Sequence, residues 1–174
     1  MSADFLDDCL AVLSRTPETL NALLRGLPAS WTHATEGEGT WSPYVVIGHL
    51  IHCEKTDWMP RVHIILEHGP TRPFDPFDRE AQLKQPQDRP LGDLLDEFST
   101  LRRESLDALR TLELQPSQLL LMGTHPAFGP VTLRQLLATW TAHDMGHLLQ
   151  ISRVMAKRLK TDVGPWTEYL SVMK

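Results

Sequence analysis

The chain has 174 residues, which is enough for one well-buried core and short for two domains. Its 41% hydrophobic and 22% charged residues are typical of a globular protein and exclude a disordered one. The formal net charge of −5, with Lys and Arg scattered along the chain, argues against a nucleic-acid-binding protein. No apolar run approaches the roughly 20 residues of a membrane span. We therefore expect a single domain over residues 1–174 that contacts neither nucleic acid nor membrane.

The two cysteines and the N-terminus bear on the compartment. Cys9 and Cys53 are far apart and form no CxxC pair, which favours a reducing cytosol in which both thiols are free. The N-terminal stretch MSADFLDDCLAVL carries three aspartates and no basic segment, so it does not resemble a signal peptide. These features predict a soluble, cytoplasmic protein.

Helical patterns dominate the first part of the chain. Residues 3–26 are predicted to be helical, with a boundary or kink where Thr16 is suited to cap a helix and Pro17 to begin one. Residues 31–41 are expected to form a loop. Ser42 and Pro43 mark a second helix start, and the apolar pattern then continues to about residue 66, as in a helix inside a bundle. Pro60 is expected to kink that helix.

The remaining segments predict two more long helices. Residues 69–90 contain five prolines and are expected to form a long crossover, which lets successive helices run parallel. Residues 91–112 form a third amphipathic helix, 115–131 a Gly/Pro-rich loop, and Thr132 caps a fourth helix that extends to about residue 159. Residues 164–170 are expected to form a short docked helix, and no convincing strand is found. The pattern predicts an all-α four-helix bundle with a crossover between helices 2 and 3.

Two histidines interrupt the apolar stripe of the fourth helix. Leu136, Trp140 and Ile151 recur at helical spacing, and His143 and His147 occupy the two positions between Trp140 and Ile151. Residues one turn apart have Cβ atoms about 5–6 Å from each other, so one metal ion can bridge both rings. A buried hydrogen-bonded pair of histidines is an equally good explanation of the spacing.

A metal site requires a third ligand, and His49 is the best candidate. It lies in the second turn of a helix that is expected to pack inside the bundle, whereas His52, one turn further, is a possible extra ligand. The alternative for both is a histidine at the edge of the core. His33 and His125 lie in expected loops, where they could close over a site, although solvent exposure is the simpler expectation.

Catalytic residues are weakly marked, and no HExxH motif is present. Asp144 projects about 100° round the helix from His143, which favours contact with a neighbouring helix or support of a ligand over the position of a metalloprotease base. Gln150 lies one turn past His147 and could orient that ligand or a bound water. Glu54 is a weak candidate for a general base. Imidazole ligands suit several metals.

Several segments together resemble the DinB/YfiT-like superfamily. They are WSPYVVIGHLIHCE (41–54), GTHPAFGPVTLRQLLATWTAHDMGHLLQISRVM (123–155), GPWTEYL (164–170) and LSRTPETLNALLRGLP (13–28). The resemblance implies an up-down-down-up four-helix bundle, often a homodimer, and a divalent metal on three histidines, which by position are His49, His143 and His147. Where relatives commonly have an aspartate three residues after the first histidine, this sequence has His52, followed by Cys53.

Two functional hypotheses follow. Family members of known activity are metal-dependent S-transferases or isomerases that use low-molecular-weight thiols, and others are classed as hydrolases. The first hypothesis is thus a hydrolase or thiol S-transferase with Zn²⁺ or Ni²⁺, whose small-molecule substrate enters between loops 31–41 and 115–131 past Trp41, Trp140 and Phe128. The second is a non-catalytic bundle with a structural or vacant metal site that serves dimerisation or protein interaction.

Overall fold

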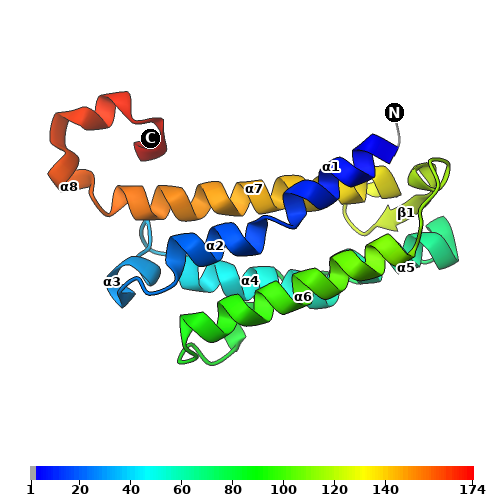
Figure 1. Cartoon of the computed structure of the whole chain (residues 1–174), viewed down its shortest axis with the longest axis horizontal. Coiled ribbons are helices and arrows are strands. Elements are labelled where there is room, and N and C mark those ends of the chain that lie inside the picture. The colour runs from blue at the N-terminus through cyan, green and yellow to red at the C-terminus, as the bar shows by residue number, and fades with distance from the viewer. Residues whose placement is uncertain (1–2) are drawn as a thin grey trace.

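Four long helical stretches form the body of the molecule, and the computed structural model describes residues 3–174 (Figure 1). Two of the stretches are each divided into two helices. In chain order they are α1 (Ala3–Leu13) with α2 (Thr16–Leu24), α4 (Pro43–Thr56) with α5 (Trp58–His68), α6 (Leu91–Thr111), and α7 (Leu133–Lys157). The short α3 (Ala29–Thr32) joins the first two stretches. The predicted four-helix bundle is confirmed.

Contacts between the helices give their directions. Phe5 of α1 packs on Arg134 and Thr16 of α2 bonds Asp144, so the α1–α2 stretch runs parallel to α7. Trp58 stacks on Trp140 while His49 contacts His143, so the α4–α5 stretch runs antiparallel to α7. Arg25 pairs with Asp96 whereas Arg102 bonds the Leu13 carbonyl, so α2 and α6 are antiparallel. The order is up-down-down-up, with residues 69–90 crossing back along the bundle (Figure 1).

The helix boundaries follow local chemistry, with one exception. The Ser42 hydroxyl accepts a hydrogen bond from the Val45 backbone N–H, which confirms the predicted cap. The second stretch breaks at Asp57, because Pro60 has no N–H to donate to the carbonyl one turn earlier. The prediction that Thr16 caps α2 is wrong. Thr16 is the first residue of that helix, and its hydroxyl donates to Asp144, 2.6 Å away.

A β-hairpin corrects the expectation that the chain contains no strand. β1 (Met122–His125) and β2 (Gly129–Thr132) pair antiparallel across a three-residue turn that closes at Gly129, whose φ is +74°. The crossover also joins this hairpin, since the Phe74 N–H donates to the Thr124 carbonyl. A Cβ atom on Gly123 would lie 2.7 Å from side-chain atoms of Ile65 and Phe74, so the hairpin packs tightly against α5 and the crossover.

The start of α7 agrees with the sequence, and the tail agrees with it in part. Thr132 and Gln135 form a reciprocal capping box at the N-terminus of α7. The tail forms short helical segments, α8 (Lys160–Val163), η4 (Gly164–Tyr169) and η5 (Ser171–Met173). The predicted segment 164–170 is helical but has no buried residue from 164 to 169, and the tail docks instead through Met173, where η5 contacts α7. In the part of the chain that the structure describes, no helix combines the length and the apolar character that a bilayer crossing would require.

A buried ion network separates two apolar clusters of the core. Arg102 of α6 is 1% exposed, donates to Glu54 of α4 and Asp144 of α7, and also donates to the Leu13 carbonyl at the end of α1. Its guanidinium lies over the ring of Phe98 in one cluster and over Trp140 in the other. One side chain thus contacts all four helical stretches.

We expect Arg102→Ala to lower the free energy of unfolding by about 3–5 kcal/mol, because it leaves two carboxylates buried without their cation. The matched control is Arg103→Ala, the exposed neighbour on α6, which should change stability by less than about 0.5 kcal/mol. Urea unfolding followed by circular dichroism measures both. Equal midpoints for the two variants would show that the network does not hold the bundle together.

Candidate metal centre

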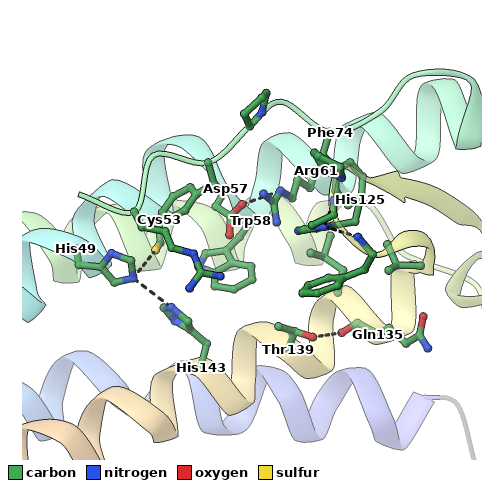
Figure 2. A pocket seen from close by; sticks show the side chains of 18 of the residues that line it. His49, Cys53, Asp57, Trp58, Arg61, Phe74, His125, Gln135, Thr139 and His143 are labelled. Carbon is green, nitrogen blue, oxygen red and sulfur yellow. Dashed lines mark hydrogen bonds and ion pairs between the residues drawn. The ribbon is translucent and has the colours of Figure 1, made fainter. Parts of the chain in front are cut away.

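Three imidazoles converge between α4 and α7. His49 comes from the second turn of α4 and is 4% exposed, while His143 and His147 lie one turn apart on α7. The Nε2 atom of His143 is 3.3 Å from Nε2 of His49 and 3.1 Å from Nε2 of His147. The structure therefore brings together the three histidines that the sequence singles out (Figure 2 shows His49 and His143).

Hydrogen bonding alone cannot satisfy this arrangement. A neutral ring nitrogen carries either one proton or one lone pair, so Nε2 of His143 can make one ordinary hydrogen bond but has two nitrogen neighbours. A cation faced by all three lone pairs removes the conflict. Ligand nitrogens about 2.0–2.1 Å from one tetrahedral ion lie about 3.3 Å apart, close to the separations of His143 from His49 and from His147. The residues present fit a divalent metal ion.

The protonation states also suit a metal. Burial, reinforced by the neighbouring imidazoles, lowers the pKa of His49 to about 3. Burial, and the repulsion that a protonated His147 would exert, lower the pKa of His143 to about 3 as well, and burial lowers the pKa of His147. All three rings are thus neutral at neutral pH, which is the form that binds metal.

Gln150 orients one of the rings from behind. Its Oε1 atom lies 2.8 Å from Nδ1 of His147, and this contact places the proton on Nδ1 and leaves Nε2 with a free lone pair. The Nδ1 atoms of His49 and His143 are buried and have no such partner among the described residues. The structure thus places Gln150 against His147, and its role in orienting a metal ligand stays a prediction.

Cys53 lies beside the histidines, one helical turn after His49. Its Sγ atom is 3.4 Å from Nε2 of His49, and the potential ligand atoms of His49, Cys53 and His143 all lie within 4.8 Å of one another (Figure 2). Burial, with the nearby carboxylates of Asp57 and Glu54, raises the pKa of the thiol. The i, i+4 spacing from His49 was the signal in the sequence for this proximity.

A cavity of about 600 Å³ opens next to the three histidines. Its walls come from α4, α5 and α7, from the crossover, and from the turn of the hairpin (Figure 2). Five aromatic and three charged side chains contribute to the lining. The aromatic lining residues are Trp41, Trp58, Phe74, Phe77 and Phe128, and the charged ones are Asp57, Arg61 and Arg79.

The sequence foresaw some of these walls. Trp41 and Phe128 line the cavity, as does His125, whereas Trp140 lies in the core and stacks on Trp58 with ring centroids 5.6 Å apart. The contribution of the crossover was not foreseen, because nothing in a proline-rich stretch marks which side chains turn inward. Asp57 was also missed, although its spacing of two turns from His49 places both on one face of the helical stretch.

The other sequence candidates lie elsewhere. Glu54 and Asp144 face Arg102 within the core and do not line the cavity, so Asp144 makes the predicted contact with neighbouring helices. His52 is not brought to the three histidines: its ring lies against Phe77, 5.0 Å between centroids, and its Nε2 is near the Thr56 hydroxyl. His52 lines a second, smaller cavity formed with the crossover.

The chain is similar in structure to a solved protein and in sequence to a protein family. YfiT from Bacillus subtilis, described as a probable metal-dependent hydrolase with an unusual four-helix bundle topology, superimposes with a TM-score of 0.77 and 20% identity, covering 90% of this chain and 89% of that one. No functionally curated protein matches. A family model described as the DinB superfamily matches residues 13–151, which span most of the chain. The chain therefore belongs to the DinB superfamily.

Proposed function

We propose that this protein is a metal-dependent enzyme in which His49, His143 and His147 hold one divalent ion, zinc or nickel, at the wall of the cavity. The observation that carries the proposal is the convergence of three neutral imidazole Nε2 atoms beside that cavity. The description of YfiT as a probable metal-dependent hydrolase supports the same chemistry.

Two reaction classes suit such a centre: hydrolysis, and transfer of a low-molecular-weight thiol to an electrophile. A zinc-like ion with open positions lowers the pKa of bound water towards about 7, or keeps a bound thiolate deprotonated, and so supplies a nucleophile at neutral pH. The cavity volume suits one small-molecule substrate.

The cavity walls favour a substrate with an apolar body and a neutral or anionic group. Aromatic side chains cover much of the surface and would exclude water around the bound molecule. Nε of Arg61 lies 2.7 Å from a carboxylate oxygen of Asp57 and pairs with it. Of the two arginines that line the cavity, Arg79 is the one without an ion pair among the described residues. An anionic group on the substrate would complement Arg79.

Asp57 is the carboxylate that the described residues contribute to the cavity lining. Burial raises the pKa of its side chain more than Arg61 lowers it. A carboxyl group with a raised pKa is better placed to exchange a proton near neutral pH. We propose that Asp57, and not Glu54 or Asp144, accepts a proton from the bound substrate or donates one to it.

A second candidate function is a structural metal site in a non-catalytic bundle. The position of Cys53 favours it, because a fourth protein donor would close the site against water and substrate. The two functions differ in what metal removal does to folding, since the binding energy of a structural ion is part of the folding energy.

Purified native protein should bind about one divalent ion per chain, and His49→Ala and His143→Ala should reduce this to near none. His63→Ala is the matched control, because this histidine lies on α5 with its side chain 48% exposed. Elemental analysis measures the bound metal and thermal unfolding measures stability in the same samples.

The combined result separates the two functions. Loss of metal with stability retained supports a site for chemistry, whereas loss of metal together with loss of folding supports a structural ion. A native protein that takes up no metal when offered zinc or nickel contradicts both. Metal-loaded protein that passes the first test should then be screened against electrophiles with several cellular thiols, and against esters and amides.

Gln150→Ala should weaken zinc binding by about 10–100-fold, because His147 loses the acceptor that fixes its proton on Nδ1. Gln150→Glu keeps an acceptor at the same position and should bind zinc at least as tightly as the native protein. Competition titration with a chromophoric chelator measures both affinities. Identical affinities for the Ala and Glu variants would remove Gln150 from the site.

A further inference from the structure

We propose that Cys53 supplies a fourth donor to the metal centre, which makes it a site of three nitrogens and one sulfur. The proposal rests on the proposed metal-binding role of the three histidines and extends it. Its starting observation is that Sγ of Cys53 lies 3.4 Å from Nε2 of His49, on the same face of α4.

The distances agree with a shared ion. Zinc–sulfur bonds of about 2.3 Å and zinc–nitrogen bonds of about 2.0–2.1 Å at a tetrahedral angle separate the two donors by about 3.5 Å. Sγ of Cys53 and Nε2 of His49 are 3.4 Å apart. A ring nitrogen of His143 lies within 4.8 Å of the ligand atoms of both residues. His147 is not a member of this group, and its link to the other donors is the 3.1 Å contact of its Nε2 atom with Nε2 of His143.

Packing alone is the competing explanation, because a buried free cysteine often acts as a small apolar side chain. Cys53 is 1% exposed and lies in the apolar cluster that contains Trp58, which fits that role. However, its only polar contact among the described residues is the ring nitrogen that faces the other two histidines. Cys9, the other cysteine, is also buried but belongs to no potential ligand group in residues 3–174.

Coordination by Cys53 would change the chemistry of the centre. The S–H bond breaks, a metal–sulfur bond forms, and the proton passes to solvent, so the net charge of the centre falls by one. A thiolate favours zinc, cobalt and nickel over the harder manganese and magnesium ions. In a four-coordinate ion Cys53 would fill the fourth position and favour the structural metal site over the enzyme, and catalysis would then require a fifth position at the ion.

Cobalt(II) substitution of the full-length protein tests the proposal. Cobalt bound by three histidines gives visible ligand-field bands, and a thiolate ligand adds an intense sulfur-to-cobalt charge-transfer band in the near ultraviolet. We expect that band in the native protein and in Cys9→Ser, and its loss in Cys53→Ser with the ligand-field bands retained. Zinc affinity should fall at least about tenfold in Cys53→Ser and should not change in Cys9→Ser.

Each result has a separate meaning. Ligand-field bands without the charge-transfer band, in native protein and Cys9→Ser, would overturn the role of Cys53 and leave the three-histidine site in place. Absence of any cobalt spectrum would overturn the three-histidine site as well. If Cys53→Ser does not fold, a charge-transfer band in Cys9→Ser still assigns the sulfur, because Cys53 is then the sole cysteine of the chain.

Discussion

The guanidinium of Arg102 fixes how the helices stand relative to one another, and the metal centre depends on that arrangement. It bonds Glu54 and Asp144, which are the sequence neighbours of Cys53 and His143. The two carboxylates face the core while the candidate ligands beside them face the cavity. A shift of α4 along α7 would therefore separate ions inside the core and ligands at the cavity together. The cost of desolvating these charges offsets much of their attraction, so the network adds little net stability, but loss of one member leaves a buried charge unpaired.

Much of the fold could be predicted because residues next to several helix ends mark where those helices begin or break. Ser42 and Thr132 cap their helices as local hydrogen bonding requires, and Pro60 accompanies the break in the second stretch. The hairpin could not be predicted, since four-residue strands in a proline-rich segment show no clear alternation and depend on pairing with the distant crossover. Thr16 misled for a similar reason: its hydroxyl serves a residue far away in sequence.

Some residues of the candidate site could likewise be predicted from local sequence patterns, and others could not. His143 and His147 could be identified because they interrupt an apolar stripe, and His49 because it lies within a helix expected to be buried. Asp57 and Arg79 could not, because what brings them to the cavity is the course of the chain around Pro60 and through the crossover. The partner of Asp144 was equally hidden, since Arg102 appears in the sequence as one more charge on an amphipathic helix.

The hairpin and the crossover line the cavity, held together through Gly123 and Phe74, and neither carries a candidate metal ligand or a member of the Arg102 network. Apart from Phe77, whose ring packs on His49, replacements in these two segments can reshape the space offered to a bound molecule without touching a candidate ligand. Differences in substrate range among such bundles would then be concentrated in the hairpin and the crossover. Two proteins with the same three histidines could therefore accept different compounds.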